Sequence, residues 1–109
     1  MANAFAYRWP VIGATPPTHQ QMEGLSRVSG IVTTDGATPS ITIVHNLSIS
    51  DDDLARDLPD VSFTAKGATF NDQNVFVAGK TANDITLTTD GDVAVSFGVN
   101  IERPTTAVR

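Results

Sequence analysis

From residue 29 to residue 101, short runs of alternating apolar and polar side chains are separated by Gly, Asp, Asn and Pro. A period of two places successive side chains on opposite faces of an extended chain, so each run predicts a strand with one buried face. The runs are Gly30–Thr34, Ser40–Asn46, Asp60–Lys66, Asn74–Gly79, Ile85–Thr88 and Val93–Ile101. Six strands joined by turn residues predict an all-β fold, mainly an antiparallel β-sandwich or open barrel.

The last run is the longest and has two unlike faces. One face carries Val93, Val95, Phe97, Val99 and Ile101, and the other carries Ala94, Ser96 and Gly98. A face of small residues predicts that another layer or a neighbouring chain packs closely against it. The Asp90-Gly91 step before this run is a strong hairpin signal, and it predicts that Ile85–Thr88 pairs with Val93–Ile101.

Two short helices are expected outside the strands. Thr18 and Gln21 have the spacing of a capping box, which predicts a helix of two or three turns from this point. Ser50 is a suitable N-cap for a second helix over Asp51–Leu58, because aspartates in the first turn favour the positive end of the helix dipole. Pro59 ends that helix.

The chain of 109 residues has the length of one domain. We expect a single β domain over residues 18–103, an extended N-terminal arm over residues 1–17 and a C-terminal tail over residues 104–109. Pro10 and the Pro16-Pro17 step disfavour a helix in the arm.

The composition argues against several classes of partner. A net charge of −5 gives no basic surplus, so no nucleic-acid partner is expected. No apolar run approaches the length of a membrane span, so no membrane partner is expected. The segment Met1–Phe5 lacks the basic and apolar regions of a secretory signal, so none is predicted.

The sequence lacks the patterns of an active site, and no enzyme, metal or cofactor is expected. There is no cysteine, nucleophile elbow, P-loop or dinucleotide fingerprint. His45 shares a strand face with Ile41 and Ile43, which predicts a buried histidine bonded to backbone; a catalytic base is the alternative. Asp51, Asp52 and Asp53 predict a solvated cluster at a helix start, with a calcium site as the alternative.

The segment around Tyr7-Arg8-Trp9 is the strongest candidate for binding another protein. Tyrosine, tryptophan and arginine are enriched at interface hot spots. The ends of the chain are weakly basic and its middle is acidic, so the ends would be attracted to a neighbouring copy. The alternative is that the aromatic side chains fold back on their own core. The predicted interface residues are Phe5, Tyr7, Arg8, Trp9, Arg103 and Arg109.

Several segments resemble small structural proteins of tailed bacteriophages. Ser40–Leu47 is similar to a strand ending in Thr-His-Asn-Leu that recurs in β modules of phage heads and tail fibres, with Val44 in place of the usual threonine. Lys80–Leu87 and Val99–Pro104 are also similar to parts of these modules, and Tyr7–Pro10 resembles the opening arm of some short virion proteins.

The resemblance implies a structural virion protein without catalytic residues. The expected role is a head decoration, or cement, protein on the outer surface of the capsid. Its partners would be the major capsid protein and other copies of itself, with a trimer favoured. The alternative is a tail or fibre module that binds the host surface or carbohydrate.

Overall fold

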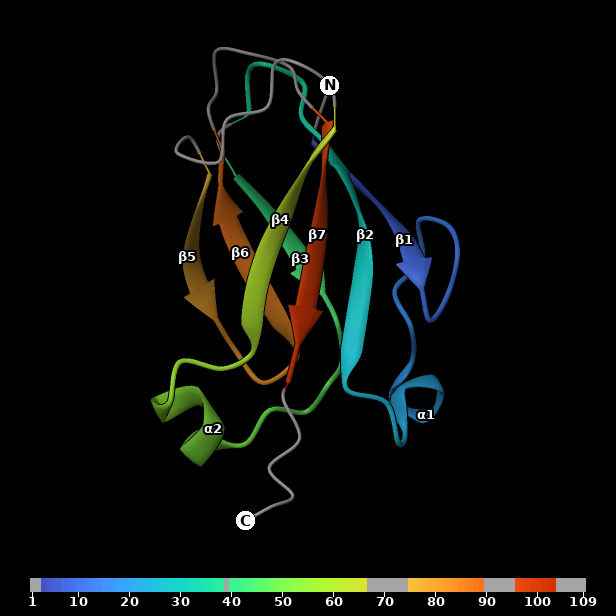
Figure 1. Ribbon diagram of the computed structural model, residues 1–109, viewed down its shortest axis with the longest axis vertical. Helices are drawn as coiled ribbons and strands as arrows, with labels where there is room; N and C mark the ends of the chain where they lie inside the picture. The colour runs from blue at the N-terminus through green and yellow to red at the C-terminus, as the bar shows by residue number, and fades with distance from the viewer. Residues whose placement is uncertain (1–2, 39, 67–74, 90–95, 104–109) are drawn as a thin grey trace.

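The computed structural model describes residues 3–38, 40–66, 75–89 and 96–103, which form two antiparallel sheets packed face to face (Figure 1). The first sheet has the strand order β1 (Ala4–Trp9), β2 (Arg27–Thr33), β7 (Ser96–Glu102) and β4 (Asp60–Lys66). The second has the order β3 (Ser40–Val44), β6 (Asp84–Thr88) and β5 (Phe76–Lys80). The all-β fold expected from the sequence is confirmed, in the form of a sandwich.

The core lies between the two sheets and is built from the alternating apolar positions. Strand β7 contributes Phe97, Val99 and Ile101, all buried, from the centre of the first sheet. The ring of Phe97 packs edge to face against Phe63 of β4, with ring centroids 5.7 Å apart. The other buried apolar side chains on the described strand positions are those of Tyr7, Val28, Val32, Ile43, Ile85 and Leu87. These alternating positions are the reason that strands form close to the predicted runs, although β2 begins at Arg27, three residues before the predicted start.

Strand β1 is part of the sandwich, so the expected arm over residues 1–17 is wrong for Ala4–Trp9. This segment pairs with β2 in antiparallel register, from Ala4 opposite Thr33 to Trp9 opposite Ser29. It is also tied to the second sheet, because the Tyr7 hydroxyl donates to the carbonyl of Val44 at 2.7 Å. Burial of Tyr7 explains the difference, since its alternation with exposed neighbours gives β1 a core-facing side.

The predicted pairing of Ile85–Thr88 with the last strand is also wrong. Strand β6 lies between β3 and β5, whereas β7 lies between β2 and β4 in the other sheet. The chain therefore crosses from one sheet to the other after β6. The Asp90-Gly91 step that gave the hairpin signal lies outside the described residues.

Two short helices lie at the same end of the sandwich (Figure 1). Helix α1 (His19–Met22) has the predicted capping box, in which the amide of Gln21 donates to Thr18 Oγ1 at 3.1 Å. It is one turn long and not two or three, because Glu23 takes a ψ of 127° and Gly24 a φ of +77°, and neither angle belongs to a helix. Helix α2 (Asp51–Ala55) begins after Ser50, as predicted. Neither helix has the length needed to cross a membrane.

Replacing Gly30 with alanine is expected to destabilise the fold by about 2 kcal/mol, because the new methyl group overfills a closed site. A Cβ at this position would lie 2.5 Å from Cζ of Phe5 and even closer to the carbonyl oxygen of Ala6, both in β1. The matched control is Gly79→Ala, whose Cβ would meet no atom within 4 Å. Urea denaturation of the two variants measures the difference. Equal unfolding midpoints would contradict the close approach of β1 to β2.

Candidate functional site

Of the predicted interface residues, Tyr7 belongs to the core of the chain itself, and Phe5 packs against that core. Tyr7 is 4% exposed, and burial raises the pKa of its hydroxyl despite the bond to Val44. Phe5 is half-buried and packs edge to face on Tyr7, with ring centroids 4.6 Å apart. The prediction that these two side chains contact another protein is therefore wrong. They hold β1 against the rest of the sandwich.

The next residues along the chain form an exposed patch, here called the Trp9 patch and made of Arg8, Trp9 and Ile12. Trp9 is 45% exposed and Ile12 is 88% exposed. The loop that carries them is fixed at its base, because the backbones of Tyr7 and Gly13 exchange two hydrogen bonds of 2.7 and 3.1 Å. The patch thus lies at the end of β1 and in a loop whose base is closed by hydrogen bonds.

An arginine from β2 supports the Trp9 ring. The guanidinium carbon of Arg27 lies 5.7 Å from the centroid of the ring, within the range of a cation–π contact. Arg27 and Trp9 are both exposed, so the pair presents a charged and an aromatic group together at the surface. Such groups are common at the centre of protein interfaces.

The predicted C-terminal interface residues have a different placement. Arg103 is half-buried, and its guanidinium donates to the carbonyl of Leu47 at 3.3 Å. Its backbone amide donates to Ser26 at 2.8 Å. Arg103 therefore links β7 to neighbouring loops of the same chain, and the structure does not bring it to the Trp9 patch. Arg109 lies outside the described residues.

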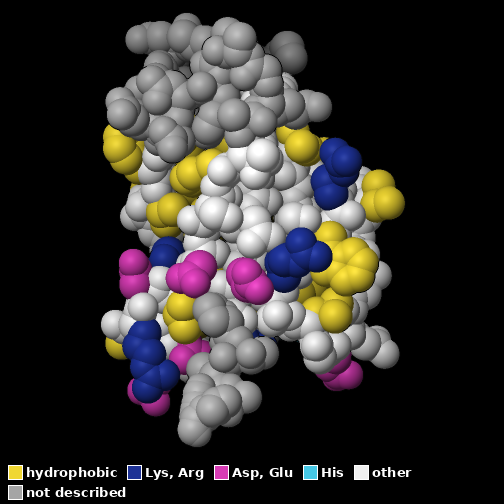
Figure 2. All heavy atoms as spheres, in the orientation of Figure 1, with side chains coloured by type: hydrophobic (Ala, Val, Ile, Leu, Met, Phe, Trp, Pro, Cys, Tyr) yellow, Lys and Arg dark blue, Asp and Glu magenta, His cyan; other side chains and the backbone are white. Residues whose placement is uncertain are grey.

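The solvent-facing side of the sheet β1-β2-β7-β4, here called the outer sheet face, carries mostly small side chains. A shallow depression of about 360 Å³ is lined there by Arg8, Ser29, Ile31, Thr64, Gly98 and Asn100. Figure 2 views this side of the molecule, and the area directly above its central row of charged side chains is mostly free of charged and hydrophobic side chains. The small residues that the sequence placed on the second face of the last strand lie here, at Ser96 and Gly98.

A row of charged side chains crosses the same face. Antiparallel register places Asp60 of β4 opposite Glu102 of β7, and Glu102 opposite Arg27 of β2. All three are exposed, and two acidic side chains beside a basic one are visible across the middle of Figure 2. Within the described part of the chain, none of the three forms an ion pair. Opposed like charges repel, so Asp60 and Glu102 form an unfavourable pair in the single chain.

His45 is buried and bonded to backbone, as predicted. Its Nδ1 accepts a hydrogen bond from the amide of Leu47 at 2.9 Å. Its Nε2 has no partner among the described residues. Burial lowers the pKa of His45 from 6.5 to about 4, and the nearby Asp84 opposes this shift without reversing it. A neutral histidine enclosed in the core is a structural element of the sandwich.

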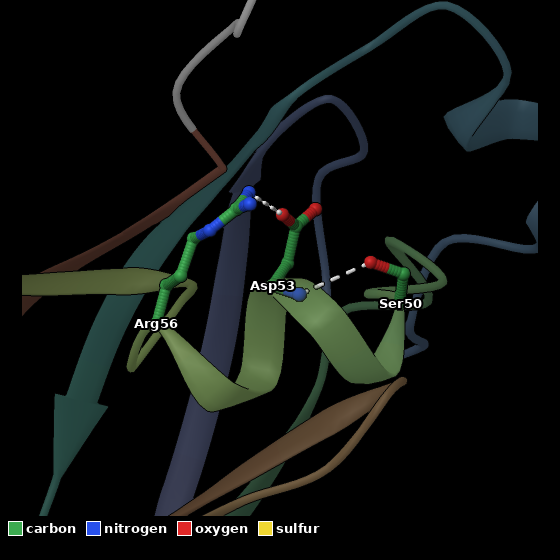
Figure 3. Close-up of polar contacts among 3 residues, drawn as sticks. All are labelled: Ser50, Asp53 and Arg56. Carbon is green, nitrogen blue, oxygen red and sulfur yellow. Dashed lines mark hydrogen bonds and ion pairs between the residues drawn. The ribbon is translucent and has the colours of Figure 1, made fainter.

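The aspartate cluster forms the first turn of α2, as the helix-start prediction required (Figure 3). Ser50 Oγ accepts a hydrogen bond from the Asp53 amide at 3.1 Å, and Asp53 forms an ion pair with Arg56 at 3.3 Å. Asp51 and Asp52 are exposed. The described residues contain no group of three or more side chains placed to hold a metal ion.

Sequence reasoning missed Ile12 and Arg27 as surface residues beside Trp9. Ile12 could have been found from its place between Pro10 and Gly13, because an apolar residue within a turn has little core to enter. Arg27 had no such signal, since its contact with Trp9 depends on the pairing of β1 with β2.

Trp9, Ile12, Arg8 and Arg27 lie on β1, on the loop after it and on the neighbouring strand β2. Such aromatic, aliphatic and arginine side chains can bind another protein through buried apolar area and directed hydrogen bonds. The face beside them offers a second, polar surface of small residues and opposed charges. Comparison of the chain with protein-family models, curated proteins and solved structures finds no match.

Proposed function

We propose that this chain is a structural virion protein that decorates the outer surface of a bacteriophage head. In this role it binds the major capsid protein and stabilises the shell by bridging neighbouring subunits. Copies of the chain associate with one another on the shell. The role needs no catalytic residue and no cofactor.

The observation that carries the proposal is the exposed, anchored Trp9 patch. An exposed tryptophan and an exposed isoleucine three residues apart offer a partner apolar area to bury. The patch lies on a strand that is hydrogen-bonded on one side to β2 and tied through Tyr7 to β3. A partner that binds it therefore gains a preformed surface and loses little conformational entropy.

The phage-like segments support the proposal because they fall on elements that form the sandwich. Ser40–Leu47 contains β3, and Lys80–Leu87 contains most of β6. Within the first segment, His45 accepts the bond from Leu47, and Asn46 donates to the carbonyl of Pro17 at 2.7 Å. The His-Asn-Leu end of the strand thus fixes a corner of the fold.

The mechanism is added contact area repeated over the shell. A specific interface buries roughly 1,600 Å² in total, and a small patch such as this one supplies only part of that area. Repetition over many capsid sites makes weak contacts collectively strong, because each bridged subunit holds the next binding group near its own site.

Replacing Trp9 with alanine is expected to weaken binding to shells that lack this protein by about 30-fold, the effect of losing one interface hot spot. The double variant, which carries Ile12→Ser together with Trp9→Ala, is expected to bind the shells more weakly still. The matched control is Phe76→Ala, which removes another exposed aromatic ring from β5 in the second sheet. Co-sedimentation with shells, with the bound copies counted, measures the affinity.

The outcome that contradicts the proposal is full binding by the double variant, or no binding by the unchanged chain. Truncation of residues 1–13 is not a suitable test, because it removes β1 and uncovers the core below Tyr7. Point substitutions leave the backbone pairing of β1 in place.

A tail or fibre module that binds carbohydrate is the second candidate. It is favoured by the position of Trp9, whose ring is held on the folded domain and is nearly half exposed, as a sugar-stacking ring must be. A glycan array separates the two roles: binding that Trp9→Ala abolishes supports the module, and binding to shells alone supports decoration.

A further inference from the structure

We propose that the outer sheet face pairs with the same face of a second copy, about a two-fold axis that runs parallel to the strands between β2 and β7. The inference deepens the association of copies that the proposed function includes, and it rests on that part of it. It identifies the surface, the symmetry and the contacting residues.

The charges of the face are arranged so that two copies complement each other. Along one row, the side chains change from acidic at Asp60 and Glu102 to basic at Arg27. The acidic end lies on β4 and β7, and the basic end lies on β2 and β1. One half of the face is therefore negative and the other half is positive at the same height along the strands.

A two-fold axis parallel to the strands brings these halves together. Rotation about it keeps the height of each residue and reverses the strand order, so β2 of one copy lies over β7 of the other. Arg27 of each copy then faces Glu102 of its partner, twice in one interface, as an isologous contact requires. A two-fold axis across the strands would move the row to the opposite end and separate the charges. A three-fold axis does not bring the same face of two copies together in this way.

The middle of the face permits close approach. Its side chains are small or polar, including Ser29, Gly98 and Asn100, and Ile31 is the apolar exception at the centre. Sheets that face each other usually pack about 10 Å apart with larger side chains between them, so the small side chains here let the two faces approach more closely. In the single chain Glu102 lies between one cation, its own Arg27, and one like charge, Asp60, and pairing adds a second arginine facing it.

The area of the outer sheet face sets the expected affinity of the dimer. Four strands of about seven residues cover roughly 450 Å² in projection, or about 900 Å² over two copies, which is below the standard interface. We therefore expect a weak dimer that forms in the micromolar range or above, and that becomes fully populated when copies are concentrated on a surface.

Sedimentation equilibrium from about 1 µM to about 1 mM tests the pairing without any shells, over the range of a weak interface. The unchanged chain is expected to reach twice the monomer mass. Arg27→Glu and Glu102→Lys are each expected to weaken the dimer at least about tenfold, because each places two like-charged pairs in the interface. An equimolar mixture of the two variants is expected to restore it, since both pairs in the mixed dimer are then attractive.

Two further variants test whether the effect depends on the position of the charge and whether the centre of the face is buried in the dimer. Glu23→Lys makes the same charge change as Glu102→Lys at an exposed position after α1, and is expected to leave the dimer unchanged. Ile31→Lys buries an unpaired charge at the centre of the face, and no mixture is expected to rescue it. Circular dichroism melting confirms that each variant is folded.

Monomers at the highest concentration, trimers, or a mixture that stays as weak as its components would each overturn the inference. These results are distinct from those for the head-decoration role. A failure of shell binding with an intact dimer rejects the decoration and keeps the pairing, and the reverse result rejects the pairing alone.

Discussion

Lowering the pH from 7 to 5 is expected to reduce the free energy of unfolding by about 2 kcal/mol, through His45 alone. The folded chain holds this side chain neutral, with a pKa of about 4 in place of 6.5. Between these two values the unfolded chain binds a proton that the folded chain does not. The contribution of neutral His45 to the free energy of unfolding is therefore fully present above pH 6.5. It decreases as the pH falls from 6.5 to 4, and about 3 kcal/mol of it is lost at pH 4.

The physical cause of the pH dependence is the enclosed imidazole. His45 is fully buried, and one of its nitrogens already accepts the Leu47 amide. A proton added there breaks that bond, and a charge within the core loses its hydration. The Asp84 carboxylate stabilises the charged form to a smaller extent.

Substitution of each histidine separates this effect from other titrations. His45→Asn retains an acceptor near the Leu47 amide but does not titrate, so its unfolding free energy is expected to be level from pH 7 to pH 5. His19→Asn removes the exposed histidine and is expected to keep the decrease. Urea denaturation at several pH values measures both. A decrease of equal size in His45→Asn would show that other groups cause it.

Asp35 adds a second loss of stability at lower pH. Hydrogen bonds from Thr38 and from the amide of Ala37 lower the pKa of its carboxyl group to about 2. The stabilising contribution of a carboxylate with a lowered pKa is present above its unfolded value near 3.9 and is lost as the pH falls toward the folded value. This window lies below that of His45, so measurements above pH 5 report mainly on the histidine.

Replacing Phe97 with alanine is expected to lower the free energy of unfolding by about 3–5 kcal/mol. Phe97 is fully buried in β7, the strand that pairs with both β2 and β4. Its removal leaves a cavity between the sheets and deletes the edge-to-face contact with Phe63. Since domains of this size are stable by about 5–15 kcal/mol, this loss is a large share of the total stability.

The matched control is Phe76→Ala, in which the same atoms are removed from a ring that is 59% exposed on β5. Its expected cost is below about 1 kcal/mol, because little apolar contact is lost. Guanidinium denaturation of the two variants gives the comparison. A small loss in Phe97→Ala would mean that the sheets do not pack on each other through this residue.

Much of the local structure could be predicted because it depends on neighbours in the sequence. The alternation in Asp60–Lys66 gives a strand with those bounds, since each side chain has only two faces to choose from. Thr18 and Ser50 begin their helices by bonding amides three residues away. The place of His45 beside Ile43 on a buried face was also predictable, and so was its bond to backbone.

The candidate site could be predicted only in part. Arg8 and Trp9 lie at the surface beside one another along the chain, as the sequence suggested. Tyr7 was assigned to the same surface and is instead in the core, because alternation shows that two faces exist but not which of them the rest of the chain will cover. The contact of Trp9 with Arg27 required β1 to pair with β2.

The sequence by itself determined which segments are extended, where two helices begin and which side chains share a face, because these follow from interactions over a few residues. Only the tertiary structure decided which strands are neighbours: β1 joins the first sheet, and β6 and β7 separate into different sheets. The tertiary structure also decided that Glu102 lies between Asp60 and Arg27 on neighbouring strands. Strand partners are chosen by the burial of both sheets at once, which is a property of the whole chain and of no single segment.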